Sequence, residues 1–473
     1  MAPTVAVVGG GISGLAACYH LVRSPQPPKV LLLEASARLG GWLQSTRTPD
    51  GTVFEHGPRG IRPGGAVGAD TLHMVSEIGL EGDVLPVPGD HPASRNRFLY
   101  IGRALHQLPS SLRALLRPVP PFSQALLWSG VRDLLAPAGT EPDETVHSFA
   151  QRRFGCEVAD VAIDSLCRGV FAGDCRALSI RSCFPLLFEA ERRWRSVILG
   201  LALGTRKERG AQSRLSQRAR TERWSQWSLR GGMESLAEAL AAFVHLRGVE
   251  LRCHLPLRRL KRHPDGRWQL ILADGTVTAD HVVSALPAAA LAEVLPANAQ
   301  PLAQELRQIP SVSVAVVNLQ YQGIELPVTG FGHLVPSSED SSLLGIVYDS
   351  VAFPQHNGAA ATSVRLTVML GGAWFQQSFG DPATAAPELL LARAQGAVRD
   401  HLGLELPPTH SIVRVHQDCI PQYTLGHWQR TERIRRFLAE QQLPLSLIGA
   451  SYAGVSVNDC IASAKAAVEQ LLG

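Results

Sequence analysis

The first forty residues constrain the fold most strongly, because they place a glycine pattern between a strand and a helix. The apolar run TVAVV precedes Gly9-x-Gly11-x-x-Gly14, and an apolar-periodic helix follows. A second apolar run, KVLLLE, ends at Glu34, twenty residues after Gly14. In a βαβ unit of this kind the helix N-terminus faces a pyrophosphate, and the acid accepts hydrogen bonds from ribose hydroxyls. The sequence therefore predicts a Rossmann-like, dinucleotide-binding N-terminus.

Each glycine of this pattern has its own predicted role. Gly9 allows the tight turn, Gly11 lets the backbone approach the pyrophosphate, and Gly14 lets the helix pack closely on the strand. The alternative is a glycine-rich turn in an unrelated α/β protein.

Two further glycine-bearing regions indicate a long cofactor, FAD rather than NAD. ASARLGGW and FEHGPRGI follow Glu34, and LPLSLIGASYAGVSVNDC near the C-terminus reads as strand, glycine turn and helix. The N-terminus of that last helix could stabilise negative charge on a reduced flavin, although an ordinary closing β–α unit would look the same. The predicted cofactor residues are Gly9, Gly10, Gly11, Ile12, Ser13, Gly14, Glu34, Trp42, Gly57, Pro58, Arg59, Gly60, Gly449, Gly454, Val455 and Ser456.

Length, charge and cysteine usage exclude several classes. A chain of 473 residues predicts two or three domains. A formal net charge of +4 does not suggest nucleic acid as a partner. The eight cysteines form no CxxC and no zinc spacing, so we expect free thiols and no metal. We also expect no signal peptide, no cleavable presequence and no spanning helix, since VILGLALG is the longest fully apolar run near the centre.

Motifs along the chain resemble the FAD-dependent amine oxidase superfamily, and more closely its protoporphyrinogen oxidase family of the animal mitochondrial type. They include GGGISGLAA, RLGGW, FEHGPRGIRP, SRNRFLY, DSLCRGVFAGD and GASYAGVSVNDC. The similarity covers essentially the whole chain, and departures lie mainly in residues 205–223, 355–363 and 375–400. The resemblance implies an α/β plus α+β fold with a discontinuous Rossmann-like FAD-binding domain (1–92, 211–297 and 421–473), an α-helical membrane-binding domain (93–210) and a mixed-sheet substrate domain (298–420).

The same resemblance implies an activity and a set of substrate residues. The expected reaction is the oxygen-dependent oxidation of protoporphyrinogen IX to protoporphyrin IX, with release of hydrogen peroxide, at the penultimate step of haem biosynthesis. We expect no protein base, because the cofactor carries the hard step. The implied residues are Arg97 for a propionate, Phe331, Leu334, Val347 and Met369 for apolar walls, Gly169 for ring space and Leu257 for the adenosine end of FAD. From sequence alone, the wall residues and Gly169 read as core, and Leu257 reads as a strand residue.

The segment SRNRFLY reads as a strand in which Arg95, Arg97 and Leu99 share one face. A solvated sheet edge is one interpretation. The other is that Arg97 holds a carboxylate with its two-pronged guanidinium, while Arg95 stays in solvent.

Residues 108–137 alternate short apolar helices with prolines and arginines, a pattern that fits an interfacial amphipathic element. Residues 191–223 carry ten Arg or Lys against three Glu, which suits an anionic leaflet. The alternatives are an internal helical core and a solvated loop. The resemblance implies one-sided binding to the mitochondrial inner membrane from the intermembrane space, a homodimer, and ferrochelatase as a partner.

Two rival functions remain open. A flavin amine oxidase typically places a lysine near the flavin, but no lysine occurs between Lys261 and Lys465. A catalytically silent flavoprotein that serves as a structural partner in haem synthesis is the second rival.

Overall fold

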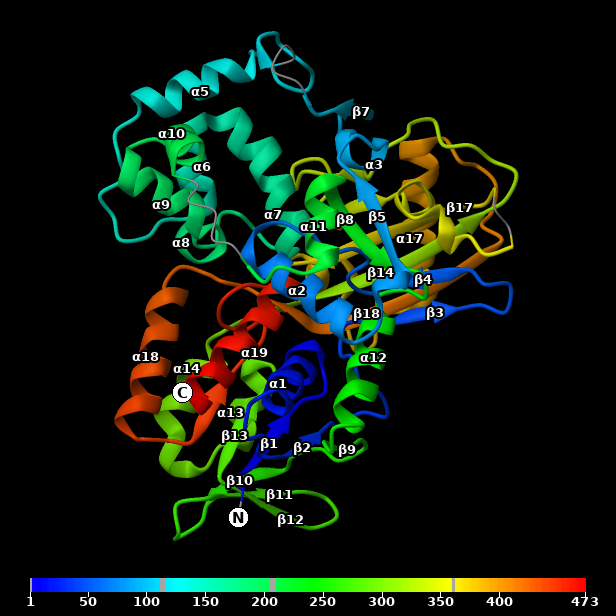
Figure 1. Ribbon diagram of the computed structural model, residues 1–473. Coiled ribbons are helices and arrows are strands. Elements are labelled where there is room, and N and C mark those ends of the chain that lie inside the picture. Colours follow the sequence, from blue (N-terminus) through cyan, green and yellow to red (C-terminus); the bar gives the residue numbers. More distant parts are fainter. Residues whose placement is uncertain (1, 111–114, 205–209, 360–361) are drawn as a thin grey trace.

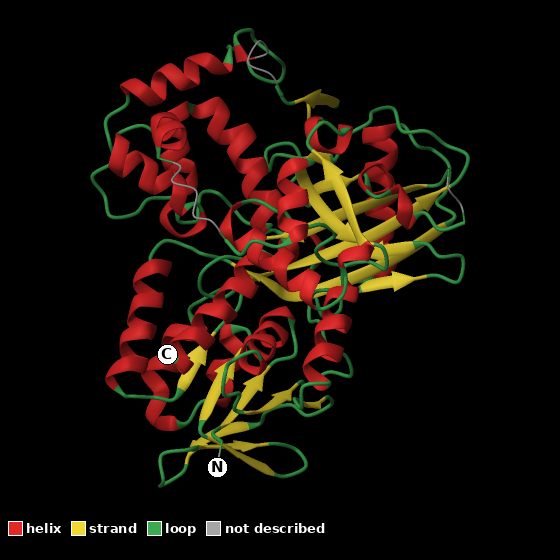
Figure 2. Cartoon of the chain, viewed as in Figure 1, coloured by secondary structure: helices red, strands yellow, loops and turns green. Residues whose placement is uncertain are grey.

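The computed structural model describes residues 2–110, 115–204, 210–359 and 362–473. Three regions are visible in Figure 1: a sheet region beside the N-terminus, a larger sheet region, and a helical region at the upper left. Figure 2 shows that strands concentrate in the first two regions and that helices make up the third. The predicted mixture of α/β and α+β structure is therefore confirmed at this coarse level, whereas the domain boundaries stay predictions.

A five-stranded parallel sheet forms the N-terminal region, in the order β19-β13-β1-β2-β9. Its strands are β1 (Thr4–Val8), β2 (Lys29–Leu33), β9 (Glu250–Arg252), β13 (His281–Ser284) and β19 (Leu445–Leu447). They come from distant parts of the chain because parallel neighbours need long crossover connections. Both faces are buried, so the strands are almost continuously apolar.

The two faces of this sheet carry separate cores. On one face Val5, Val7 and Leu32 pack with α1 (Ile12–Val22), α12 (Glu234–His245) and α19 (Val457–Leu472). On the other face Ala6 and Leu33 pack with a three-stranded antiparallel sheet and three helices. These elements are β10 (Arg259–Arg262), β11 (Trp268–Ile271), β12 (Thr276–Ala279), α13 (Ala288–Val294), α14 (Gln300–Arg307) and α18 (His427–Glu440). The alternation along each strand thus separates two helix–sheet interfaces.

A seven-stranded sheet forms the second region, in the order β18-β14-β17-β16-β15-β6-β7. The strands are β6 (Phe98–Ile101), β7 (Ala104–Gln107), β14 (Ser311–Tyr321), β15 (Gly332–Leu334), β16 (Leu343–Val347), β17 (Val364–Gly372) and β18 (His410–Pro421). All neighbours are antiparallel except β15 and β6, which are parallel, so the sheet is mixed. Helix α17 (Pro387–Leu402) packs on one face through Leu390, Ala394 and Val398.

The strand predicted for SRNRFLY is confirmed only for its second half. Phe98–Ile101 form β6, which pairs with β15 and buries Phe98 and Leu99. Arg95 was expected on a strand with Arg97, but it ends the short helix α3 (Pro92–Arg95), which begins at a proline. Arg95 and Arg97 therefore do not share a strand face.

The helical region has a small core of its own around Phe149, Phe171 and Tyr423. Its elements are α5 (Leu126–Leu135), α6 (Val146–Phe154), a π-helical stretch (Val158–Ile163), α7 (Asp164–Phe171), α8 (Ile180–Cys183), α9 (Pro185–Trp194) and α10 (Val197–Leu203). The remaining elements are α2 (Gly65–Glu77), α11 (Arg214–Thr221), α15 (Asp349–Ala352), α16 (Phe375–Phe379), three 3₁₀ turns (Glu81–Asp83, Ala297–Ala299, Pro354–His356), and the pairs β3 (Ser45–Arg47) with β4 (Val53–Glu55) and β5 (Val84–Pro88) with β8 (Trp224–Leu229).

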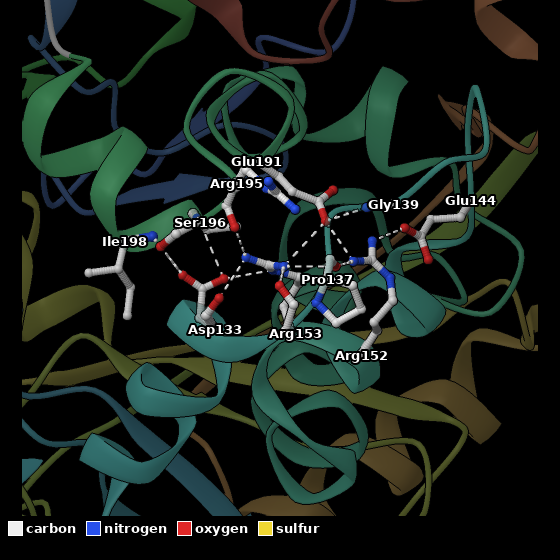
Figure 3. Close-up of polar contacts among 12 residues, drawn as sticks. Asp133, Pro137, Gly139, Glu144, Arg152, Arg153, Glu191, Arg195, Ser196 and Ile198 are labelled. Atoms are coloured by element: carbon white, nitrogen blue, oxygen red, sulfur yellow. Dashed lines mark hydrogen bonds and ion pairs between the residues drawn. The ribbon is translucent and has the colours of Figure 1, made fainter.

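A buried polar network holds α5, α6, α9 and α10 together (Figure 3). Arg153 donates from Nε to Asp133 at 2.7 Å, and both side chains are fully buried. Asp133 also accepts from the Ser196 hydroxyl at 2.5 Å and from the Ile198 N–H at 3.0 Å, at the start of α10. Glu191 accepts from Arg152 at 2.5 Å. Because these groups satisfy one another inside the bundle, the network ties the four helices together.

Candidate functional site

The predicted cofactor segments converge at the carboxyl ends of the parallel strands. The Gly40 N–H donates to the Gly10 carbonyl at 2.8 Å, and Gly11 forms an isolated bridge with Gly40. Gly449, with a φ of 103°, lies against Ser13 at the start of α1. The structure therefore brings the N-terminal and C-terminal glycine turns together around one helix N-terminus; we call this arrangement the cradle.

The glycines of the fingerprint have the packing that their predicted roles require. A Cβ on Gly14 would collide with the Gly9 carbonyl oxygen, so the helix packs on the turn as closely as predicted. A Cβ on Gly11 would meet nothing nearer than the Gly41 Cα at 3.8 Å. Space is thus left open at Gly11, where a pyrophosphate would approach the free N–H groups of the helix N-terminus.

Glu34 lies at the end of β2 with its carboxylate held by backbone. The carboxylate accepts from the Gly10 N–H at 2.7 Å and from the Ser36 N–H at 2.8 Å. The Leu255 N–H donates to the Glu34 carbonyl at 2.9 Å, so the loop after β9 passes the end of β2. Leu257 lies in this loop between β9 and β10, so its assignment to a strand was wrong. Its contact with the adenosine end of a cofactor stays a prediction.

Arg38 of the RLGG motif shapes the loop that carries Trp42. Its guanidinium donates to the Gly41 carbonyl at 2.7 Å, to the Leu43 carbonyl, and to Glu234 at 2.9 Å. A Cβ on Gly57 would collide with the Trp42 carbonyl oxygen, so FEHGPRGI packs directly on this loop. The Trp42 side chain is 43% exposed and meets His416 edge-on. The RLGG motif therefore builds the wall of the cradle through backbone contacts.

Tyr423 organises the C-terminal turn, and sequence reasoning missed it. Its hydroxyl donates to the Ala450 carbonyl and accepts from the Gly454 N–H at 2.9 Å. Ser456 then caps α19 by accepting from the Asp459 N–H, and Val455 packs against the core of the helical region. The only sequence signal was the aromatic residue in CIPQYTLGHW, which says nothing about its partner 27 residues later.

Arg59 supplies an orphaned donor in the cradle. Its Nη1 pairs with Asp349 at 2.8 Å, and the side chains are 8% and 10% exposed. Its Nη2 is buried and has no acceptor within the described chain. Asn458 in the first turn of α19 donates to the Arg62 carbonyl at 2.9 Å, so this segment runs beside that helix N-terminus. A buried cationic donor without a partner is costly, and the electron-rich atoms of a flavin dinucleotide fit it.

Three of the four predicted wall residues, Leu334, Val347 and Met369, lie on one face of the seven-stranded sheet. Leu334 pairs with Gly345, Gly345 pairs with Met369, and Val347 follows two residues later, so the side chains of all three predicted residues point the same way. They are half-buried, whereas His333, Ile346 and Val368 on the opposite face are fully buried under α17. We call the half-buried side the apolar face.

Gly169 on α7 lies over this apolar face. A Cβ at Gly169 would stand 3.0 Å from two methyl carbons of Leu334, so a larger residue would push into the wall. The end of α7 also joins the cradle, since Gln422 donates to the Phe171 carbonyl at 2.8 Å and precedes Tyr423. The structure therefore brings Gly169, Leu334, Val347 and Met369 to one place between the helical region and the cradle.

Arg97 stands at the edge of the apolar face. Its guanidinium carbon lies 5.7 Å from the centre of the Phe331 ring, and the Phe331 N–H donates to the Asn96 carbonyl. Loss of part of its water shell, together with the positive charge of Arg62, lowers the pKa of Arg97. No hydrogen bond or ion pair engages this guanidinium among the residues that the structure describes. The arrangement offers an uncompensated cation beside an apolar wall.

Two buried histidines, His333 and His56, are fully engaged within the protein. His333 contacts the Tyr348 hydroxyl at 2.8 Å and His401 at 2.9 Å. His56 contacts Thr46 at 2.6 Å and Asn318 at 2.9 Å. Burial lowers the pKa of His333 to about 3 and that of His56 to about 4, so both rings are neutral at pH 7.

Known proteins resemble this chain over its full length. The family described as flavin containing amine oxidoreductase matches residues 12–472. Protoporphyrinogen oxidase of Macaca fascicularis is 60% identical over 100% of this chain and 99% of its own length, and that of Homo sapiens is 59% identical with the same coverage.

Solved structures share the fold. A crystal structure from Exiguobacterium sp. 255-15 has a TM-score of 0.79 at 25% identity and covers 100% of this chain and 99% of that one. Cyclohexylamine oxidase from Brevibacterium oxydans has a TM-score of 0.67 at 18% identity with full coverage of both chains, which shows the fold alone. With these matches, the cradle and the apolar face assign the chain to the flavin containing amine oxidoreductases, and within them it belongs to the protoporphyrinogen oxidase family.

Proposed function

We propose that this protein oxidises protoporphyrinogen IX to protoporphyrin IX with molecular oxygen as acceptor, releasing hydrogen peroxide, at the penultimate step of haem biosynthesis. The observation that carries the proposal is the unpaired Arg97 at the edge of an apolar face that adjoins a flavin cradle. A flat, apolar macrocycle with acidic side groups needs this combination, because its ring is stabilised by apolar contact and its carboxylates by a cation.

The cofactor that we propose is FAD rather than a shorter flavin. Glu34 follows β2 with its carboxylate on the Gly10 N–H, and an acid at this place of a βαβ unit accepts from the ribose of an adenosine half. When bound, the flavin would supply the redox chemistry, namely hydride acceptance and electron transfer to oxygen. The chain itself contributes the Gly11 opening for the pyrophosphate and the Arg59 donor for an electron-rich atom.

We propose that the chain positions the substrate rather than deprotonating it. Leu334, Val347 and Met369 hold one side of the ring, and Gly169 leaves room for it. The neighbouring histidines His56 and His333 have both ring nitrogens engaged within the protein. Our interpretation that no protein group acts as the base stays a prediction.

We further propose that the protein binds one leaflet of a bilayer through α5 and α10. No helix within the described ranges has the length and apolarity to span a membrane. The polar network of Figure 3 ties the two helices together, while apolar side chains on both stay exposed. These residues are Leu127, Trp128, Leu134, Leu135, Ile198, Leu199, Leu201 and Leu203. Exposed apolar side chains gathered on two connected helices suit an interface with lipid.

Part of the predicted membrane surface lies outside the described residues, namely residues 111–114 of the amphipathic segment and 205–209 of the basic stretch. Phe122, which shares that segment, is buried and so belongs to the core. We propose the mitochondrial inner membrane, on the intermembrane-space side, as the location. The homodimer and the contact with ferrochelatase also remain proposals, and they rest on the family resemblance.

One assay separates the proposed reaction from its rivals. The purified protein is supplied with protoporphyrinogen IX, and porphyrin fluorescence, oxygen uptake and hydrogen peroxide are recorded together. Loss of six hydrogens per macrocycle requires three molecules of oxygen and three of peroxide for each porphyrin formed. Benzylamine serves as the control substrate for an amine oxidase. Turnover of the amine alone would support the first rival, and a yellow protein that turns over neither substrate would support the silent partner.

A further inference from the structure

A buried ion pair joins the cradle to the seven-stranded sheet. Arg59 belongs to the segment that follows β4, and Asp349 begins α15 directly after β16. The Arg59 Nη1 donates to Asp349 Oδ1 at 2.8 Å. The Thr367 hydroxyl of β17 donates to Asp349 Oδ2 at 2.6 Å. Both carboxylate oxygens are thus engaged, and the orientation of the carboxylate is fixed from the sheet.

The polar contacts continue behind Asp349 into the same interface. Asn318 of β14 donates to Thr367 Oγ1 at 2.8 Å and to the Glu55 carbonyl at 3.0 Å. Arg365 is buried nearby and donates to the Val53 carbonyl at 3.0 Å. Glu55 in turn accepts from the Met233 N–H at 2.7 Å and from the Ser45 hydroxyl at 2.8 Å. Two buried arginines therefore face two buried carboxyl groups, and Asp349 is the one that contacts Arg59.

The guanidinium of Arg59 is only half used by the protein. Asp349 occupies Nη1, while Nη2 is buried and finds no acceptor in residues 2–110, 115–204, 210–359 or 362–473. A planar guanidinium held at one nitrogen has its other nitrogen fixed in direction as well. A bound group with an electron-rich atom would supply the acceptor that Nη2 lacks.

We propose that Asp349 is a positioning residue that holds Arg59 with its free Nη2 donor directed at the bound flavin, so that flavin affinity depends on docking of the large sheet against the cradle. The inference rests on the proposed flavin site. Arg59 is the group that contacts the cofactor, and Asp349 acts through it.

The test measures flavin affinity of the full chain. Apoprotein of wild type and of Asp349→Asn is titrated with FAD, and the dissociation constant is read from quenching of flavin fluorescence. We expect Asp349→Asn to raise that constant by roughly tenfold or more, as for the loss of one charge-assisted hydrogen bond. The matched control is Asp133→Asn, which also removes the charge of a fully buried aspartate paired with arginine, but in the helical region. The control should lower thermal stability and leave the dissociation constant within about a factor of two.

Two further variants distinguish positioning from a structural role. In an Arg59→Met background, Asp349→Asn should weaken flavin binding no further, because the group that it orients is gone. Thr367→Val keeps every charge and the side-chain volume, and it should weaken binding in the same direction as Asp349→Asn but less. If Asp349→Asn does not fold, Thr367→Val by itself tests the positioning role.

The outcomes are separable. Three results would overturn the positioning role. The first is that the losses of flavin affinity add in the double variant, and the second is that Asp133→Asn loses as much affinity as Asp349→Asn. The third is that Thr367→Val and Asp349→Asn both bind flavin as tightly as wild type. Failure of wild type to bind FAD in the same titration would instead overturn the proposed function.

Discussion

Replacing Arg97 by alanine tests the substrate site most directly. The guanidinium has no partner within the described chain, stands 5.7 Å from the Phe331 ring, and feels only the repulsive charge of Arg62. Removing it should therefore cost the fold little. It should cost the substrate a charge-assisted hydrogen bond worth about 1.5–3 kcal/mol.

That energy converts to a rate. At about 1.4 kcal/mol per decade, Arg97→Ala should lower kcat/KM by about one to two decades. The side chain is exposed, so the lower end of this range applies if water screens the pair. The loss should fall mainly on KM, because the propionate is held alike in the ground state and the transition state. Arg97→Lys should recover part of the activity, since it keeps the charge and loses the fork.

Initial rates of porphyrin fluorescence give kcat and KM for each variant, and flavin absorbance confirms that the cradle is intact. Arg95→Ala is the matched control, since Arg95 is an exposed arginine two residues away on α3 and should leave both constants unchanged. The second control is a porphyrinogen whose propionates are esterified. If Arg97→Ala loses as much activity on the ester as on the acid, or if Arg95→Ala loses as much as Arg97→Ala, the reasoning about the propionate is refuted.

Three other perturbations follow from the structure. Gly11→Val should fold but purify without flavin, because its side chain would fill the space beside Gly41 that the apoprotein leaves open; a fully yellow variant would contradict this. Trp128→Glu and Leu135→Glu alter residues that are 61% and 80% exposed on α5, and each should weaken binding to anionic liposomes about tenfold in a flotation assay. Leu246→Glu, at an 83% exposed site that ends α12, should not. Burial lowers the pKa of His333 to about 3, so the native state binds fewer protons than the unfolded state. Below about pH 6.5 the unfolded state takes up a proton on this ring, so the free energy of unfolding falls with pH by about 1.4 kcal/mol per pH unit. His333→Phe should flatten the dependence of the unfolding midpoint on pH between 7 and 5, and an unchanged slope would show that His333 does not take up a proton on unfolding.

The sequence determined the local elements whose patterns are self-contained. Gly9, Gly11 and Gly14 predicted a strand, a turn and a helix because a βαβ turn needs glycine at those spacings. The Asp274-Gly275 pair is a hairpin signal that needs no distant partner, and β11 and β12 pair antiparallel on either side of it. The residues of the apolar face were predicted from the family resemblance alone, since the periodicity around Leu334, Val347 and Met369 is that of ordinary core residues.

Tertiary structure decided the contacts between segments that are far apart in the chain. Residues 98–107 carry no local signal for the partner strand more than 200 positions away, so their place in the large sheet could not be predicted. Arg95 lies in the short helix α3, which begins at Pro92, although the alternating pattern predicted a strand there. The pairing of Arg59 with Asp349 spans 290 positions, and Tyr423 reaches Ala450 and Gly454 across a whole helix. The type of a side chain in the sequence indicates which groups it can bond. Only the folded chain determines which partner comes within about 3 Å, because that partner depends on how all the elements between the two residues pack.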